Sequence, residues 1–152
     1  MCYMSSSPAR ILLADDHVAF RLTVADDLRQ AGFEVCAEAG SAEEAIEHAT
    51  REAPDLCLLD ISMPGGGLSA AAEISHRVPG SKVVMFTASV REEHVLEAVR
   101  SGASGYLLKD DDPTRLPIAL CDVLNGIPAF PRRLSVGLVA AARAALGTTA
   151  CT

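Results

Sequence analysis

The clearest indication of the fold is the run Leu56-Cys57-Leu58-Leu59-Asp60, in which four uninterrupted apolar residues directly precede a carboxylate. Such a run is typical of a strand buried on both faces, as in a parallel sheet covered by helices. Similar short apolar runs occur elsewhere in the chain, and the starts of successive runs lie about 21 to 27 residues apart. They cover residues 11–14, 35–37, 83–86 and 106–108. This spacing predicts five parallel strands.

Segments with a helical pattern separate these strands. The segment 18–31 stops at Gly32, a natural end for a helix, and Ser41 with Glu44 three residues later forms a capping box. The strict alternation, with right-handed crossovers, predicts a doubly wound α/β fold. The other helices are expected over residues 42–53, 68–77, 91–101 and 112–124.

The length of 152 residues suits one domain of ordinary size. We expect a flexible leader over residues 1–8, the folded domain over 9–126, and a linker with a connector helix over 127–152. Two prolines indicate the linker at 127–131, and an alanine-rich apolar stripe predicts a C-terminal extension helix at 132–146. Two interpretations of this helix stay open: it docks on the domain, or it leads to a second domain or a dimer.

Composition excludes several classes of protein. Hydrophobic residues make up 49% of the chain and charged residues 22%, which indicates a folded globular protein rather than a disordered one. No apolar run approaches the ~20 residues of a membrane-spanning helix, and the N-terminus does not resemble a secretory signal. The five cysteines show no CxxC or Cys/His metal-ligand spacing. We therefore expect a cytoplasmic protein with no membrane partner.

The charge distribution argues against nucleic-acid binding by this chain itself. The formal net charge is −7, and residues 128–152 contain three arginines and no acidic residue, so the negative charge is concentrated in the main domain. Such a domain repels a phosphate backbone.

Polar residues follow four of the five predicted strands. Asp15 and Asp16 follow the first strand, Asp60 the third, Thr87 the fourth and Lys109 the fifth. The carboxyl ends of parallel strands meet at one edge of the sheet, where ligands of open α/β folds bind. We therefore expect three carboxylates, a hydroxyl and an ammonium group to converge there.

This set of groups suits phosphoryl transfer. Three carboxylates in one pocket repel one another unless a hard cation such as Mg²⁺ or Mn²⁺ lies among them. Asp60 could then act as the nucleophile toward phosphorus, while the metal and Lys109 neutralise charge on the transferred group and Thr87 donates a hydrogen bond to it.

Four segments carry a family resemblance: ILLADDH at 11–17, LCLLDISMPG at 56–65, VVMFTAS at 83–89 and SGASGYLLKD at 101–110. Together they resemble the four signature blocks of response-regulator receiver domains, and they are most similar to the NarL/LuxR-type subfamily. The resemblance covers about residues 10–128, and it implies a (βα)5 sandwich whose five-stranded parallel sheet has the flavodoxin-like order 2-1-3-4-5.

The resemblance implies a role for each matching residue. Asp60 is the phosphoacceptor, Asp15 and Asp16 bind Mg²⁺ with Asp60, and Ser62 offers the metal its backbone carbonyl. Thr87 is the switch hydroxyl, Tyr106 the aromatic residue whose rotamer follows it, and Lys109 pairs with Asp60 or its phosphate. The peptide after this lysine is often cis in the family; the sequence leaves its state here open.

The resemblance also implies a function and partners. A sensor histidine kinase phosphorylates Asp60, and the signal changes the face formed by the fourth helix, fifth strand and fifth helix, where a homodimer forms. The output is transcription through a DNA-binding domain absent from this chain. The alternatives are a stand-alone receiver acting through protein contacts and a pseudo-receiver that is not phosphorylated. The chain is expected to assist only its own phosphorylation and dephosphorylation, not to act as an enzyme on other substrates.

Two other functions fit less well. A phosphatase of the haloacid dehalogenase type needs a second aspartate two residues after the nucleophile, where this chain has Ser62. A flavin or nucleotide binder needs a phosphate-binding loop after the first strand, where Asp15 and Asp16 stand. One departure from the family pattern is the short loop with Gly65, Gly66 and Gly67, which we expect to be reshaped and flexible.

Overall fold

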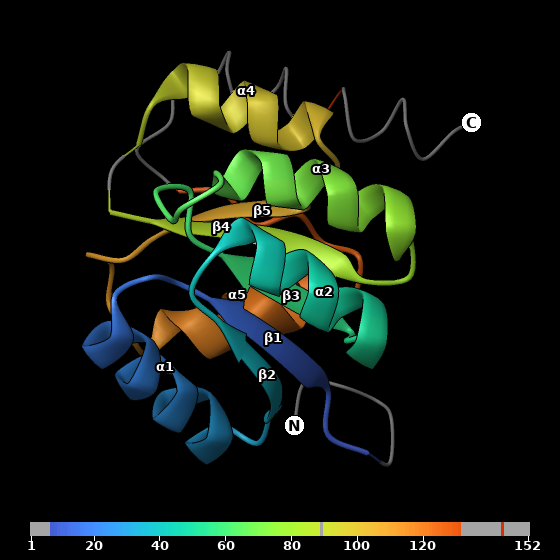
Figure 1. The fold of residues 1–152 in the computed structure, drawn as a ribbon. Helices are drawn as coiled ribbons and strands as arrows, with labels where there is room; N and C mark the ends of the chain where they lie inside the picture. Colours follow the sequence, from blue (N-terminus) through green and yellow to red (C-terminus); the bar gives the residue numbers. More distant parts are fainter. Residues whose placement is uncertain (1–6, 89, 132–143, 145–152) are drawn as a thin grey trace.

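The computed structural model describes residues 7–88, 90–131 and 144, and it contains one five-stranded parallel sheet. The strands lie in the order β2-β1-β3-β4-β5, which confirms the predicted doubly wound fold (Figure 1). β1 and β3 lie side by side in the middle of the sheet, so the carboxylates that follow them in the sequence are brought together. The strands are β1 (Arg10–Ala14), β2 (Glu34–Ala39), β3 (Leu56–Leu59), β4 (Lys82–Thr87) and β5 (Gly105–Leu108).

Five helices cover the two faces of the sheet. α2, α3 and α4 lie on one face, and α1 and α5 on the other (Figure 1). This arrangement leaves the carboxyl ends of the strands free to hold polar groups, because the connections there are loops. The helices are α1 (Val18–Gln30), α2 (Ala42–Glu52), α3 (Gly67–Arg77), α4 (Glu92–Arg100) and α5 (Arg115–Leu124).

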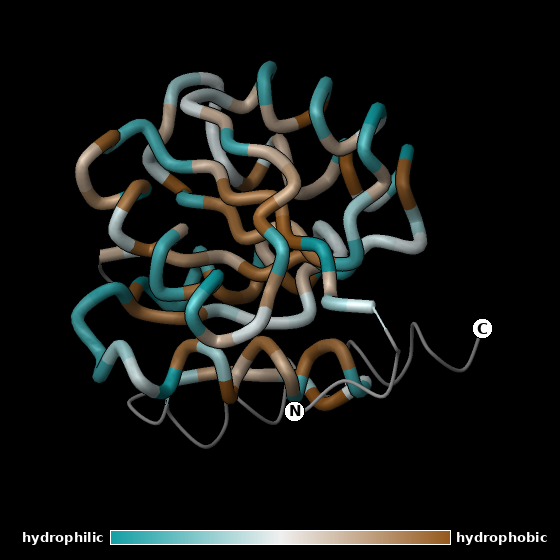
Figure 2. The backbone as a smooth tube through the Cα atoms, turned by 90° about the horizontal axis from the view of Figure 1, so that it is seen from below, coloured by the Kyte–Doolittle hydropathy of each residue, from teal (hydrophilic) through white to brown (hydrophobic). Residues whose placement is uncertain are grey.

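Alternate residues of the central strands enter two separate hydrophobic cores. Leu12 and Cys57 belong to the core under α2, α3 and α4, while Leu13 and Leu58 belong to the core under α1 and α5. The most apolar parts of the chain accordingly gather in the middle of the molecule (Figure 2). Each fully buried leucine contributes about 1.5–3 kcal/mol relative to an exposed one. Burial on both faces explains why the sequence shows continuous apolar runs instead of alternation.

The helix ends follow the signals in the sequence. The Ser41 side chain accepts a hydrogen bond from the Glu44 N–H at 3.2 Å, and the Glu44 carboxylate accepts one from the Gly40 N–H at 3.1 Å. The capping box is thus present, with its return bond shifted one residue toward the N-terminus. After α1, Gly32 has a φ of 98°, which an L side chain rarely adopts.

The segment after α5 lies along the edge of the sheet. Ala129 forms an isolated parallel bridge with Gly105 of β5, and the Tyr106 N–H donates to the Ala129 carbonyl at 2.8 Å. The first part of the predicted linker, residues 127–131, therefore covers the β5 edge instead of leaving it open. The predicted helix over 132–146 and most of the leader lie outside the described residues.

The hydropathy of the helices and the state of the cysteines bear on where in the cell the protein lies. Among the described helices, none combines the length and the hydropathy that crossing a bilayer requires. Of the cysteines that the structure describes, Cys36 and Cys57 are free thiols and Cys121 is disulfide-bonded. The cytoplasmic location inferred from cysteine usage stays a prediction.

Candidate functional site

Three carboxylates gather at the carboxyl ends of β1 and β3. Asp15 and Asp60 are only 2% and 5% exposed, whereas Asp16 is exposed to solvent. Each of the three residues offers a carboxylate oxygen, and these oxygens lie within 4.8 Å of one another. The parallel pairing of β1 with β3 produces this cluster, because it aligns Ala14 with Leu59, the last residue of each strand. The predicted convergence of the carboxylates is therefore observed.

Lys109 follows β5 and reaches the same cluster. Its ammonium nitrogen lies 2.6 Å from the Asp15 carboxylate and 3.5 Å from that of Asp60. The sequence led us to expect Asp60 as the partner of Lys109, but the shorter contact is with Asp15. No cis peptide bond occurs among the described residues, so the Lys109–Asp110 bond is trans.

The environment of Asp60 disfavours its charged form. Burial raises the pKa of the Asp60 carboxyl, the Lys109 ammonium lowers it, and the negative charge of Asp15 raises it again. The net direction is upward, so one nearby ammonium does not fully compensate for burial among carboxylates. A cation among the three carboxylates would relieve this repulsion.

The donor set fits a hard divalent cation such as Mg²⁺ or Mn²⁺. It consists of carboxylate oxygens alone, without histidine or cysteine ligands, and Mg²⁺ prefers oxygen ligands from only a few carboxylates. Asp16 is exposed beside the two buried carboxylates, so a bound ion could keep solvent ligands on that side.

The loop after Asp60 is a compact turn. The Ser62 N–H donates to the Asp60 carboxylate at 3.3 Å, and the Gly67 N–H donates to the Ile61 carbonyl at 3.0 Å. An added Cβ on Gly67 would lie 2.0 Å from the Asp60 carbonyl oxygen, so only glycine allows this close approach. Gly65 and Gly66 have φ values of 86° and 87°, which glycine adopts without strain. The glycines thus shape a compact hydrogen-bonded turn, and the flexibility expected of this loop stays a prediction.

Thr87 lies at the end of β4, whereas Tyr106 lies within a hydrophobic core. Thr87 is the last residue of β4 and is 4% exposed, and its carbonyl accepts a hydrogen bond from the Lys109 N–H at 2.8 Å. Tyr106 is fully buried in the core under α2, α3 and α4. Burial raises the pKa of its phenol. Tyr106 lies in β5 opposite Met85 of β4, and its role as a switch stays a prediction.

The start of α1 contributes residues that sequence reasoning missed. The His17 imidazole caps α1 by accepting a hydrogen bond from the Phe20 N–H at 3.2 Å, and the His17 N–H donates to the Asp15 carboxylate at 2.9 Å. The Arg21 guanidinium donates to the Asp15 carbonyl at 2.8 Å and pairs with Glu38 at 3.1 Å. Phe20 and Arg21 follow His17 by three and four residues, so both lie on the helix face beside the cap. This spacing could have indicated from the sequence that they lie near the site.

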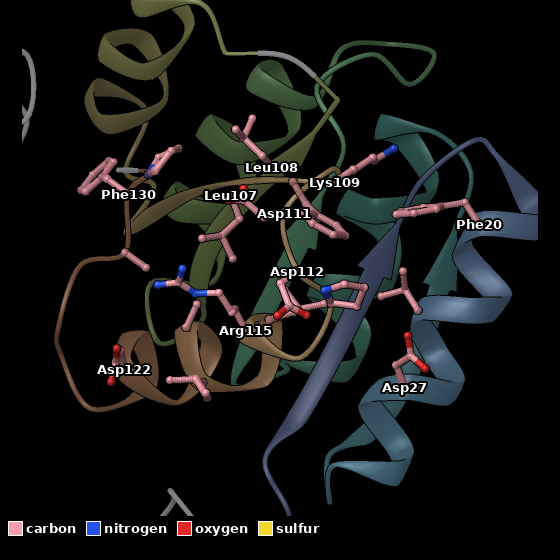
Figure 3. Close-up of a pocket in the computed structure, with 18 of the residues that line it drawn as sticks. Phe20, Asp27, Leu107, Leu108, Lys109, Asp111, Asp112, Arg115, Asp122 and Phe130 are labelled. Carbon is pink, nitrogen blue, oxygen red and sulfur yellow. The ribbon is translucent and has the colours of Figure 1, made fainter. Parts of the chain in front are cut away.

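A groove of about 430 Å³ adjoins the acidic cluster, between α1 and α5 (Figure 3). Apolar side chains such as Val24 and Leu116 line it, together with the carboxylates of Asp27 and Asp122. Phe20 and Lys109 line both this groove and the acidic cluster, so they form the boundary between the two.

The family model of the response regulator receiver domain matches residues 11–120 of this chain. The chain belongs to the response regulator receiver domain family. The match includes every residue of the acidic cluster as well as Lys109, and receiver domains are signalling proteins of two-component systems.

Relatives of this receiver domain include response regulators of the NarL/LuxR type. The nitrate/nitrite response regulator NarL of Escherichia coli K12 is 38% identical over 147 residues, which are 95% of this chain and 68% of that protein. The chain thus spans about two thirds of the length of this relative.

Two solved structures show the same fold. The signal receiver domain of a NarL response regulator from Mycobacterium tuberculosis is 32% identical with a TM-score of 0.74, and the match covers 79% of this chain and 98% of that one. A two-component response regulator of the LuxR family from Aurantimonas sp. is 33% identical with a TM-score of 0.77, covering 88% and 94%.

Proposed function

We propose that this receiver domain accepts a phosphoryl group on Asp60 from a sensor histidine kinase in the presence of Mg²⁺. The observation that carries the proposal is the buried Asp60 carboxylate beside two further carboxylates and the Lys109 ammonium. In the proposed reaction an Asp60 carboxylate oxygen forms a bond to phosphorus while the bond from phosphorus to the donor's histidine nitrogen breaks.

The other residues hold and neutralise the reacting groups. Asp15, Asp16 and Asp60, with the Ser62 carbonyl, would hold the Mg²⁺ ion, which supplies positive charge beside the phosphoryl oxygens. Lys109 already lies 3.5 Å from the Asp60 carboxylate, which places its ammonium beside the phosphate that forms there. Thr87 would donate its hydroxyl hydrogen bond to a phosphoryl oxygen.

The signal would leave the site through α4, β5 and α5. A phosphate on Asp60 attracts the Thr87 hydroxyl, and the buried Tyr106 ring and the helix α4 against which it packs adjust to that movement. The changed α4-β5-α5 face would then form a homodimer. Ala129 already forms a bridge with Gly105 of β5, so the segment after α5 would move with this face.

The output that we propose is control of transcription through a DNA-binding domain. The support is the similarity to NarL of Escherichia coli, of which this chain spans 68%. A relative from Mycobacterium tuberculosis, PdtaR, is a transcriptional regulatory protein that is 36% identical over 122 residues. The acidic receiver domain itself would not bind nucleic acid. A stand-alone receiver acting through protein contacts is the alternative.

The test is phosphorylation by a small-molecule donor. The chain is incubated with acetyl phosphate and Mg²⁺, and its intact mass and its light-scattering mass are measured. A Mg²⁺-dependent gain of one phosphate that disappears in Asp60→Ala is expected, whereas Asp26→Ala, which changes an exposed aspartate on α1, should leave the gain intact. Doubling of the light-scattering mass would place the output in dimerisation.

The opposite result is equally clear. If neither acetyl phosphate nor beryllofluoride changes the chain in the presence of Mg²⁺, Asp60 is not a phosphoacceptor and the protein is a pseudo-receiver.

A further inference from the structure

The ring of Phe20 lies against the Lys109 ammonium. Phe20 belongs to the first turn of α1, and its ring extends toward Lys109 across the boundary between the acidic cluster and the groove (Figure 3). The Lys109 nitrogen lies 4.7 Å from the centre of the ring, within the distance at which a cation is attracted to the face of an aromatic ring. The lysine side chain is 16% exposed, so water weakens this attraction only in part.

A second aromatic residue fixes the position of the Phe20 ring. The rings of Phe20 and Phe86 lie 5.8 Å apart, centre to centre, with an angle of 38° between their planes. Phe86 is 7% exposed and directly precedes Thr87 in β4. The His17 cap holds the backbone of Phe20 at the other end. The ring is therefore anchored both to the sheet and to the helix start.

We propose that Phe20 is a positioning residue that holds the Lys109 ammonium at the phosphorylation site. The aromatic ring can attract the Lys109 ammonium even when the carboxylates bind a cation. Asp15 makes the shortest contact with Lys109 at 2.6 Å, but the same carboxylate belongs to the set that fits a divalent cation. A bound cation withdraws that negative charge from the ammonium and repels it. The aromatic face still attracts the ammonium, since the ring is neutral and competes neither for metal nor against an incoming phosphate.

The proposal rests on phosphorylation of Asp60, but the contact itself can be tested without it. The chain has two lysines, Lys82 and Lys109, so selective ¹³C labelling of lysine gives two sets of Cε–H signals in NMR spectra. Lys82 is exposed at the start of β4 and serves as an internal reference. The ring current should move the Lys109 signal upfield of the Lys82 signal.

Variants then separate the aromatic face from simple packing. Phe20→Leu should abolish the upfield shift of Lys109, whereas Phe20→Trp should keep it. Phe33→Leu is the matched control, since Phe33 is buried in the same core but is not among the residues lining the acidic cluster. An unchanged Lys109 shift in Phe20→Leu would overturn the proposed contact, whether or not Asp60 accepts phosphate.

The effect on phosphorylation is measured on the same variants. Phe20→Leu should slow modification by acetyl phosphate by about 2- to 30-fold, the range expected from loss of one cation–π contact. Phe20→Trp should restore the rate, and phenylalanines carrying one, two or three ring fluorines in place of Phe20 should lower it stepwise, because fluorine withdraws electrons from the ring face.

The outcomes distinguish the two proposals. A wild-type chain that is phosphorylated, together with Phe20→Leu and fluorinated variants that are equally fast, would overturn the positioning role and leave the proposed function intact. A wild-type chain that is not phosphorylated would overturn the proposed function, and the positioning role would fall with it, even if the NMR contact is present.

Discussion

The two ends of the sheet carry charged clusters that differ in their exposure to solvent. At the amino ends of the strands, Arg10 donates to the Asp55 carboxylate through its N–H and pairs through its guanidinium with Glu34 at 3.2 Å and Glu52 at 2.9 Å. At the carboxyl ends, three carboxylates share one ammonium. Each cluster has three carboxylates around one cationic side chain, but the Arg10 cluster is partly exposed to solvent, whereas Asp15 and Asp60 of the second cluster are buried. Burial makes the repulsion among the carboxylates of the second cluster stronger, so a bound cation would stabilise that cluster more than the first.

The difference between the two clusters indicates that one stabilises the fold and the other serves function. The Arg10 cluster joins β1, β2, β3 and the end of α2, so it fixes the elements to one another. The acidic cluster tolerates a carboxyl group with a raised pKa at Asp60, which disfavours the folded state at neutral pH. Strain of this kind is typical of functional sites and is balanced by the packed core.

The largest effect is expected from close packing at the carboxyl ends. Gly67→Ala places a Cβ 2.0 Å from the Asp60 carbonyl oxygen, so the backbone must move, and a loss of about 3 kcal/mol in the free energy of unfolding is expected. At the amino ends, an added Cβ on Gly80, two residues before β4, meets no atom within 4 Å. Gly80→Ala should therefore change stability by less than about 0.5 kcal/mol. Urea unfolding of both variants checks the contrast, and equal losses would contradict it.

Removing charge at Asp60 should raise stability. Asp60→Asn keeps the shape of the side chain but removes one of the three repelling carboxylates, while Asp15 remains as partner for Lys109 at 2.6 Å. A gain of roughly 1 kcal/mol without metal is expected, together with loss of phosphorylation. Thermal unfolding in the presence of a chelator measures the gain. A variant less stable than the wild type would mean that the acidic cluster is not under repulsion.

Removing charge at Arg10 should have the opposite sign. Arg10→Met should lower stability by about 1 kcal/mol, since several partly exposed ion pairs are lost together, and leave phosphorylation by acetyl phosphate unchanged. Arg77→Met removes a single exposed pair with Glu73 and should lower stability by about 0.3–0.5 kcal/mol. Urea unfolding at low and high salt distinguishes the two, because salt screens the exposed pair.

The smallest effect is a pH dependence of the Asp60→Asn gain. The folded-state pKa of Asp60 lies above its unfolded value, so its proton stabilises the folded state below the unfolded pKa, and this stabilisation is lost as pH rises through the folded pKa. The advantage of Asp60→Asn should thus be largest at pH 7 and narrow toward pH 4. Urea midpoints measured across this range test the sign, and a gap that widens on acidification would contradict it.

Several features could be predicted from sequence because they depend on local chemistry. Continuous apolar runs indicated strands such as β3, and carboxylates directly after β1 and β3 indicated the acidic cluster. The family resemblance, which the match over residues 11–120 confirms, supplied roles that the geometry alone does not test. The shape of the turn at Gly67 could not be predicted, since it follows from close contact with the Asp60 carbonyl, which the composition of the loop does not indicate.

From the sequence alone we could predict an α/β fold, the burial of its sheet on both faces and the edge at which Asp15, Asp60 and Lys109 meet. These follow from side-chain hydropathy and from the position of polar residues along each strand. The three-dimensional packing was needed to show that Lys109 lies nearer to Asp15 than to Asp60, that Phe20 faces its ammonium, and that Ala129 pairs with β5. Distances of a few ångströms between elements far apart in the chain depend on packing, and packing has no local signature in the sequence.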